Sequence, residues 1–149
     1  AVSVKGESRR LFAGDCTIAP DAAVTAATIQ ATALQEDEFL YFIWRDGNGV
    51  VLGENDYFPK PYKAYELPRA EISAVWSDRN GSAVLTLESD RPAFFATATV
   101  DVPGYFSDNV LTLLPGRPVE LTFMPRHGAR ATSAELAASL KLRHLAETF

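Results

Sequence analysis

Apolar and polar residues alternate with a period of two along much of the chain, most clearly at residues 118–124. These residues read Pro-Val-Glu-Leu-Thr-Phe-Met, with an apolar side chain at every second position from Val119. Such alternation predicts a β-strand with one buried face. The preceding Leu114-Pro115-Gly116-Arg117 predicts a turn, because proline fixes its own φ and glycine accepts a positive φ. Residues 105–123 are therefore predicted to form two strands joined by this turn.

Similar short runs, separated by turn signals, predict further strands. We place them at 1–5, 9–12, 15–19, 22–33, 39–44, 50–58, 70–76, 83–87, 93–102 and 139–145. Alanine in 22–33 favours a helix, but valine, threonine and isoleucine there favour a strand, and the neighbouring segments are strands. The apolar run at 39–44, Phe-Leu-Tyr-Phe-Ile-Trp, predicts a strand buried on both faces, followed by a hairpin turn at 45–49. The capping-box pattern at 132–135 predicts a helical turn, and residues 127–129 before it predict a loop.

Three prolines within residues 59–68 exclude a helix and a central strand there, since proline lacks a backbone N–H. We predict a short rigid linker at 59–68. The close spacing of strands and turns predicts an all-β, immunoglobulin-like antiparallel β-sandwich fold. We expect a partial sandwich at 1–58 and a C-terminal sandwich at 69–149 with about the seven strands of an immunoglobulin-like domain. The first part has fewer strands, so it is either a small complete sandwich or one that lacks its first strand or two.

Composition narrows the class of partner. The 149 residues are 47% hydrophobic and 22% charged, as in an ordinary globular protein, and the formal net charge is −5. Nucleic acid is not an expected partner, because it needs clustered lysine and arginine, and the adjacent pair Arg9-Arg10 is typical of a solvated surface. No apolar segment reaches transmembrane length, so no membrane partner is expected. The start lacks the features of a signal peptide and is typical of a piece of a longer protein.

The residues predict no catalytic or metal site. His127 and His144 lack a metal-binding spacing, and the acidic turn at 36–38 lacks the further oxygen ligands of a calcium loop, so we interpret it as solvated. The sequence has neither a phosphate-binding glycine loop nor a nucleophile elbow. Cys16 lies in an alternating stretch, which predicts a small buried residue rather than a reactive thiol. No metal and no organic cofactor is predicted.

Contact with carbohydrate, or between domains, is the remaining candidate role for individual side chains. The candidates are Trp76, Tyr57, Tyr62, Tyr65, Asp108 and Asn109. The two tyrosines of the proline segment are interpreted as covering a seam between domains, and the Asp-Asn pair as making turn bonds to the backbone. Packing in the core or at a sheet edge is the preferred interpretation of Trp76, and core packing is the preferred interpretation of Trp44, which ends the apolar run.

Four stretches, taken in order, resemble the last domains of β-mannosidases, which are large multidomain enzymes of glycoside hydrolase family 2. They are 55–61 (Asn-Asp-Tyr-Phe-Pro-Lys-Pro), 66–68 (Glu-Leu-Pro), the strand–turn–strand stretch at 105–123 and the closing stretch at 140–149. The resemblance implies that the chain is a C-terminal accessory piece whose parent removes terminal β-linked mannose with retention. It implies the catalytic barrel and the other domains of that parent as partners, and no cofactor.

The resemblance carries over no catalytic residue. The family's catalytic glutamates lie on a barrel, and a barrel takes about 250 residues, more than this chain has. The family's acid/base glutamate follows an asparagine, whereas this sequence holds no Asn-Glu pair. The first hypothesis is a noncatalytic accessory region, for which we expect an apolar patch. The alternatives are a free-standing carbohydrate-binding module, for which we expect an exposed aromatic platform, and an immunoglobulin-like protein-interaction module.

Overall fold

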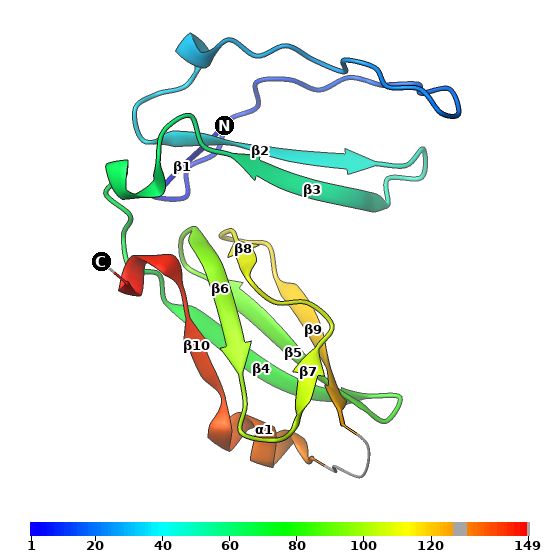
Figure 1. Ribbon diagram of the computed structural model, residues 1–149, viewed down its shortest axis with the longest axis vertical. Helices are drawn as coiled ribbons and strands as arrows, with labels where there is room; N and C mark the ends of the chain where they lie inside the picture. Colours follow the sequence, from blue (N-terminus) through cyan, green and yellow to red (C-terminus); the bar gives the residue numbers. More distant parts are fainter. Residues whose placement is uncertain (127–130, 149) are drawn as a thin grey trace. The chain divides into compact units, whose positions relative to one another are not determined.

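The computed structural model describes residues 1–126 and 131–148, and the chain divides into two compact units, Ala1–Leu67 and Pro68–Phe149 (Figure 1). Nearly all the regular structure is β-strand. The loop predicted at 127–129 lies outside the described residues. The boundary between the units lies at the end of the proline segment 59–68, most of which belongs to the first unit.

The first unit contains one antiparallel sheet in the order β1-β2-β3. Its elements are β1 (Val2–Ser3), η1 (Ala31–Ala33), β2 (Glu38–Arg45), β3 (Val51–Tyr57) and η2 (Tyr62–Ala64). The turn between β2 and β3 is built as predicted. The Asp46 carboxylate accepts hydrogen bonds from the N–H groups of Asn48 (2.9 Å) and Val50 (2.8 Å), and Gly49 has a positive φ of 85°.

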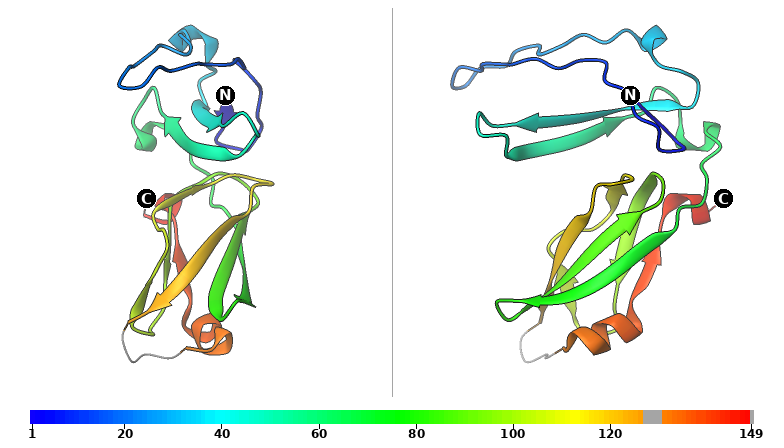
Figure 2. Two further views of the ribbon diagram at one scale, coloured as in Figure 1. Left: turned by 90° about the vertical axis from the view of Figure 1, so that its right-hand side faces the viewer. Right: turned by 180° about the vertical axis from the view of Figure 1, so that it is seen from behind.

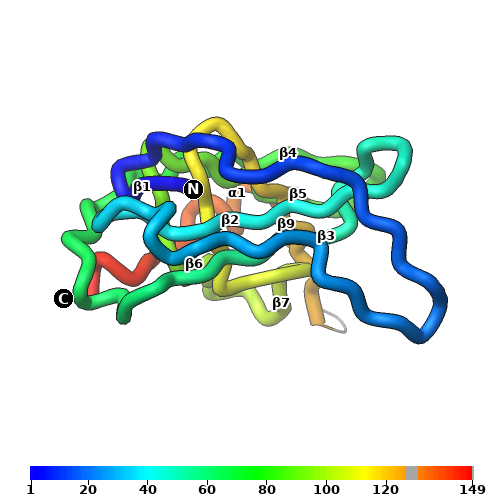
Figure 3. The backbone as a smooth tube through the Cα atoms, turned by 90° about the horizontal axis from the view of Figure 1, so that it is seen from above, coloured from blue at the N-terminus to red at the C-terminus, as the bar shows by residue number. Residues whose placement is uncertain are grey.

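The strands predicted at 9–12, 15–19 and 22–33 are wrong. The chain from 9 to 30 has no regular secondary structure, and only η1 follows before β2. It leaves the end of β1 and returns alongside the β2–β3 hairpin, which Figures 2 and 3 show from three sides. Alternation and β-propensity stabilise a strand only when a neighbouring strand accepts its backbone hydrogen bonds, and no described strand pairs with this segment. Cys16, predicted to be buried, is exposed on it.

The run at 39–44 is buried only at its beginning, so the prediction of a strand buried on both faces is also wrong. Phe39 and Leu40 are buried, whereas Phe42, Ile43 and Trp44 are 40%, 41% and 50% exposed. Only the beginning of β2 is paired with β1, at Phe39 and Glu38. The residues of an apolar run are buried only where other elements of the fold pack against them.

Over its described residues, the second unit is a sandwich of seven strands in two antiparallel sheets, the arrangement expected of an immunoglobulin-like domain (Figures 1 and 2). One sheet has the order β4-β5-β9-β7 and the other the order β10-β6-β8. The strands are β4 (Ile72–Arg79), β5 (Ser82–Ser89), β6 (Ala93–Thr99), β7 (Gly104–Phe106), β8 (Leu111–Leu113), β9 (Val119–Pro125) and β10 (Lys141–Arg143).

The core of this sandwich comes from residues of β5, β6, β8 and β9. It comprises Leu85, Leu87, Ala93, Ala96, Ala98, Leu113 and Leu121, each at most 2% exposed. The predicted turn between β8 and β9 is present: the Arg117 N–H donates to the Leu114 carbonyl (3.2 Å) and Gly116 has a φ of 69°. The two strands that it joins lie in different sheets, so the turn carries the chain across the sandwich rather than forming a hairpin.

The predicted helical turn is the start of α1 (Ser133–Ser139). Thr132 accepts a hydrogen bond from the Glu135 N–H, and the Glu135 carboxylate accepts one from the Thr132 N–H (2.9 Å), so the capping box is confirmed. Leu136 on this helix is fully buried. Its burial attaches the helix to the sandwich.

Candidate functional site

The proline segment carries an aromatic cluster that packs within the first unit. The Phe58 ring stacks on Phe39 with 4.7 Å between centroids, and lies 4.4 Å from the Tyr62 ring and 5.4 Å from the Tyr65 ring. The ammonium group of Lys60 lies 4.4 Å from the centre of the Tyr65 ring, a cation–π distance. Burial raises the pKa of both tyrosines. These two predicted contact residues are therefore engaged locally.

Tyr65 is 6% exposed, and its hydroxyl donates to the backbone carbonyl of Glu38 (3.2 Å). Because Tyr65 is buried and its one O–H proton is used in this bond, the side chain does not form an exposed platform for a sugar. Tyr65 thus connects the segment after β3 to the beginning of β2, because its ring packs beside Phe58 and its hydroxyl bonds to Glu38 of β2. Its role as an interdomain contact stays a prediction.

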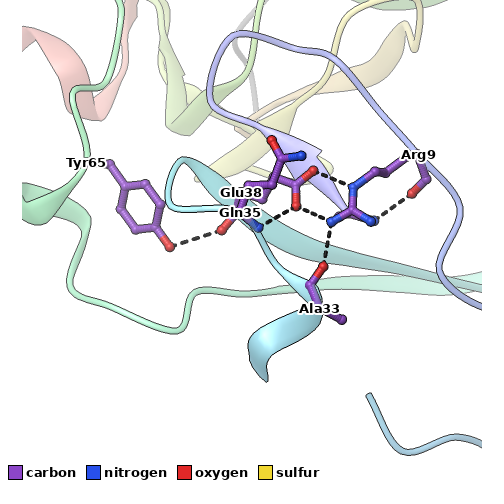
Figure 4. Close-up of polar contacts among 6 residues, drawn as sticks. Arg9, Ala33, Gln35, Glu38 and Tyr65 are labelled. Carbon is purple, nitrogen blue, oxygen red and sulfur yellow. Dashed lines mark hydrogen bonds and ion pairs between the residues drawn. The ribbon is translucent and has the colours of Figure 1, made fainter. Parts of the chain in front are cut away.

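An ion pair between the half-exposed Arg9 and the buried Glu38 lies next to this cluster (Figure 4). The Glu38 carboxylate accepts hydrogen bonds from Arg9 Nε (2.7 Å), Arg9 Nη2 (2.5 Å) and the Gln35 N–H (2.8 Å). The Arg9 guanidinium also donates to the Ala33 carbonyl (2.5 Å). The hydrogen bonds from Arg9 lower the pKa of Glu38 to about 2, so this carboxylate stays ionised well into acid.

This ion pair corrects two expectations from the sequence. Arg9 does not lie on a purely solvated surface, and Glu38 of the acidic turn is 5% exposed rather than solvated. The partners are 29 positions apart, and no local pattern relates them. The pair joins the irregular segment that follows β1 to the beginning of β2.

Tyr57 lies at the end of β3 and is 55% exposed. It pairs with Leu40, so it shares a sheet face with Phe42 and Trp44, two and four positions along β2. Trp44 pairs with Gly53 on β3, and its indole ring lies over this glycine, where an added Cβ would overlap the ring. The prediction that Trp44 packs in a core is therefore wrong: the ring covers the neighbouring strand and leaves half of its surface open to solvent.

Trp76 lies on the inner face of β4 and packs against the core of the sandwich. Its ring centroid is 6.1 Å from that of Phe106, which in turn lies 5.5 Å from Phe123. The indole Nε1 is buried without a hydrogen-bond partner among the described residues. This placement favours core packing over an exposed sugar platform, while the contact role itself stays a prediction.

Asn109 continues the second sheet of the sandwich beyond the start of β8. Its Oδ1 accepts from the Ala98 N–H (3.0 Å) and its Nδ2 donates to the Ala98 carbonyl (3.0 Å), so the side chain takes the place of a neighbouring strand. Oδ1 also accepts from the N–H of Val110, whose φ is 62°, and Asp108 accepts from the Asn109 N–H (2.7 Å). Both side chains make the backbone bonds that the sequence favoured; sugar contact stays a prediction.

The described residues, all but 127–130 and 149, contain no group of three or more histidine, cysteine, aspartate or glutamate side chains placed to hold a metal ion. Over the same residues, no helix is long and apolar enough to cross a membrane.

A hollow of about 390 Å³ lies between β4 and β5 beside Glu71, Glu88 and Asp90. Asp90 in it accepts from the Glu71 N–H (2.7 Å), which lowers its pKa, and pairs with Arg91 (2.9 Å). Asp90 therefore holds a turn.

Comparison with known proteins relates this sandwich to glycosidases. A family model for mannosidases, described as an Ig-fold domain, matches residues 67–148, which is more than half of the chain. The chain belongs to this mannosidase Ig-fold family. The matched residues coincide with the seven-stranded second unit, Pro68–Phe149. The resemblance of the sequence to the last domain of β-mannosidases is thereby confirmed, since the mannosidase Ig-fold match spans 105–123 and nearly all of 140–149.

The mannosidase Ig-fold chain is also similar to a solved structure, the crystal structure of a β-D-mannosidase from Dictyoglomus thermophilum. The two share 21% sequence identity with a TM-score of 0.80, over 96% of this chain and 17% of the mannosidase chain. At this identity the likeness confirms the all-β immunoglobulin-like fold. No curated protein sequence matches the chain. The region similar to this chain makes up 17% of the β-D-mannosidase chain, so the chain spans about a sixth of that enzyme's length.

Proposed function

We propose that this chain is a noncatalytic C-terminal accessory region of a β-mannosidase-like enzyme of glycoside hydrolase family 2. The match of residues 67–148 to the mannosidase Ig-fold family carries the proposal. The parent enzyme hydrolyses terminal β-linked mannose with retention, and the accessory region packs against its catalytic barrel and supports it. The likeness to 17% of a β-D-mannosidase supports this division, because most of such an enzyme lies outside a chain of this length.

The chemistry of the residues supports a noncatalytic role. A retaining glycosidase needs one carboxyl group that can donate a proton and a second about 5–5.5 Å away as the nucleophile. Glu38 has a strongly shifted pKa, and the shift is in the wrong direction for an acid, because hydrogen bonds from Arg9 lower the pKa to about 2. A general acid at neutral pH needs a raised pKa. Glu38 therefore stabilises the fold.

The test compares the natural reading frame that contains these residues with the 149-residue chain. We expect the longer protein to release nitrophenol from p-nitrophenyl β-mannoside and the 149-residue chain to release none. A variant of the longer protein that lacks residues 67–148 is expected to lose stability together with activity. Hydrolysis by the 149-residue chain alone would contradict the proposal, and so would a longer protein inactive on β-mannosides.

A carbohydrate-binding role is a second candidate, supported by the half-exposed Trp44 and Tyr57 on one face of the hairpin. Sugar rings stack on such aromatic faces. Titration of the chain with mannan, followed by tryptophan fluorescence, tests this role. Saturable quenching that disappears in Trp44→Ala and persists in Trp76→Phe would support it, and a flat response would exclude it.

A further inference from the structure

The chain contains two asparagine–glycine pairs, and each lies in the turn of a β-hairpin. Asn80-Gly81 joins β4 to β5, and Asn48-Gly49 lies between β2 and β3. All four residues are exposed. Asparagine is a thermolabile residue, because the backbone nitrogen of the next residue can attack its side-chain amide. A following glycine leaves the path of this attack open, since glycine has no Cβ.

The reaction at such a pair needs only water and a free peptide nitrogen. Base removes the proton of the glycine N–H, and the nitrogen then forms a bond to the asparagine Cγ. The Cγ–Nδ2 bond breaks, and ammonia leaves with a proton taken from water. Water opens the resulting succinimide ring at either carbonyl, which gives aspartate or isoaspartate. In isoaspartate the main chain runs through the former side chain, so the backbone is one atom longer.

The turn of the β2–β3 hairpin holds both reacting groups of its pair. The Gly49 N–H donates to the Asp46 carbonyl (3.0 Å), and Arg45 Nη1 donates to the Gly49 carbonyl (3.0 Å). The Asn48 N–H donates to the Asp46 carboxylate (2.9 Å). The pKa of Asp46 is lowered first by the Val50 N–H and then by hydrogen bonds that include one from the Asn48 side chain. The attacking nitrogen is therefore occupied and the amide under attack is tethered.

The turn of the β4–β5 hairpin leaves the same two groups open. In the described part of the chain, no hydrogen bond reaches the Asn80 side chain or the Gly81 N–H. An added Cβ would meet nothing within 4 Å at Gly81 and likewise at Gly49, so the space around the two glycines is matched. The two pairs therefore have the same sequence and similar exposure, and they differ in hydrogen bonding.

The conformation of this turn also favours its opening. Asn80 and Gly81 have positive φ values of 51° and 79°, as in two-residue hairpin turns, and asparagine adopts such a φ less readily than glycine. The turn projects from the end of the two strands (Figure 1). Loop tips open locally at a small cost in free energy, which supplies the rotation that the attack requires.

We propose that Asn80 is a site of spontaneous succinimide formation and of conversion to isoaspartate, whereas Asn48 is protected by the hydrogen bonds of its turn. The substrate is the chain itself, and water is the co-reactant. The inference does not depend on the proposed function, because it uses only the two hairpin turns.

Isoaspartate at position 80 would disturb the end of the sandwich. The turn has only two residues, closed by the pair Arg79 and Ser82, and its twist matches that of the strands. An additional main-chain atom in so short a turn separates this pair. The preceding residue, Asp78, accepts a hydrogen bond from Ser133 Oγ at the start of α1 (2.9 Å). The modification therefore loosens the hairpin end and the attachment of α1 together.

Incubation of the 149-residue chain in mildly alkaline buffer, followed by peptide mapping with mass spectrometry, tests the inference. We expect Asn80 to lose its amide at least about fivefold faster than Asn48, the ratio that one net hydrogen bond at the Gly49 nitrogen supplies. Enzymatic methylation of isoaspartate should label position 80. In urea that unfolds both units, the two asparagines should react at similar rates, because their immediate neighbour is the same.

Two variants separate the steps of the inference. Asp46→Ala removes the tether, so Asn48 should react faster in a first unit that Trp44 fluorescence shows to be folded, while the rate at Asn80 stays the same. Asn80→Asp adds the charge of deamidation without the additional main-chain atom. Its second unit should unfold in urea as in wild type, whereas the isoaspartate form should unfold at a lower urea concentration.

The opposite results overturn the inference. Equal rates at Asn80 and Asn48 in the folded chain would mean that the hydrogen bonds of the first turn give no protection, as would an unchanged rate at Asn48 in Asp46→Ala. A rate difference that persists in urea would assign the effect to sequence rather than to structure. Isoaspartate at position 80 with unaltered unfolding of the second unit would contradict the predicted disturbance of the hairpin end.

Discussion

Replacing Glu38 by glutamine removes the charge at the centre of the first unit while keeping the size of the side chain. The native Glu38 side chain is 7% exposed, and its carboxylate accepts three hydrogen bonds, two from Arg9 and one from the backbone of Gln35. A glutamine has one acceptor oxygen, and its NH₂ group would face the Arg9 guanidinium, where two donors meet. We therefore expect the first unit to lose stability and the second to be unaffected.

The size of the loss follows from the pKa of Glu38. A decrease in pKa from 4.5 to about 2 corresponds to roughly 3 kcal/mol of interaction with the ionised form, at about 1.36 kcal/mol for each unit of pKa. The Arg9 side chain is 42% exposed, so solvent screens part of that interaction. We expect Glu38→Gln to lower the free energy of unfolding of the first unit by about 1–2 kcal/mol at pH 7.

The same pair predicts how stability depends on pH. The folded-state pKa of Glu38 lies below its unfolded value, so its contribution is present above about pH 4.5 and is lost as the pH falls toward 2. The wild-type first unit should lose more stability than Glu38→Gln over this interval, because the variant has no carboxyl group to protonate there. The two proteins should approach the same stability in acid.

Urea unfolding followed by tryptophan fluorescence measures each unit separately. With Trp76→Phe in the background, Trp44 reports on the first unit, and with Trp44→Phe, Trp76 reports on the second. Glu120→Gln is the matched control, since Glu120 forms a similar two-point pair with Arg79 in which both side chains are about half exposed. The control should cost its unit much less. Equal costs for the two substitutions would refute the reasoning, as would parallel pH profiles of wild type and Glu38→Gln.

Three further substitutions test local features. Gly53→Ala should push the Trp44 ring off the neighbouring strand and increase its quenching by acrylamide, because the added Cβ would overlap the indole; unchanged quenching would contradict the cross-strand packing. Asn109→Ala should destabilise the second unit by about 2 kcal/mol in urea unfolding, since it leaves both backbone groups of the buried Ala98 without their partners. Thr132→Ala should cost about 1 kcal/mol by the same assay through loss of the helix cap, and Thr132→Ser should restore most of it.

Much of the second unit could be predicted from the sequence because its signals are local. The alternation in β9, the turn at Pro115-Gly116 and the capping box of α1 each depend on residues a few positions apart. Local sequence also identified the turn-forming role of Asn109, but not its partner, Ala98, 11 positions away. That pairing depends on the position of Ala98 on β6 relative to the start of β8, and a sheet's order is set only when its strands assemble.

The first unit was predicted less well because burial and strand pairing in it depend on residues that are distant in the sequence. The apolar pattern at 39–44 and the β-propensity of 22–33 are real, but burial and pairing need a neighbouring element at the right place. Arg9 and Glu38 were each interpreted as solvated, since neither has a local partner in the sequence. Their pairing lowers one pKa and buries one charge, and both effects exist only once the two segments meet.

By itself, therefore, the sequence determined the all-β class, the turns of the second unit, the helix cap and the resemblance to mannosidase accessory domains. Turn chemistry, capping and strand alternation are properties of neighbouring residues, so they can be recognised without the fold. Only the tertiary structure decided that Trp44 is exposed, that Tyr65 is buried and that Glu38 is ionised against Arg9. Exposure and ionisation are set by the atoms that surround a group in space. Many of those atoms belong to residues far away in the sequence, so local patterns do not reveal them.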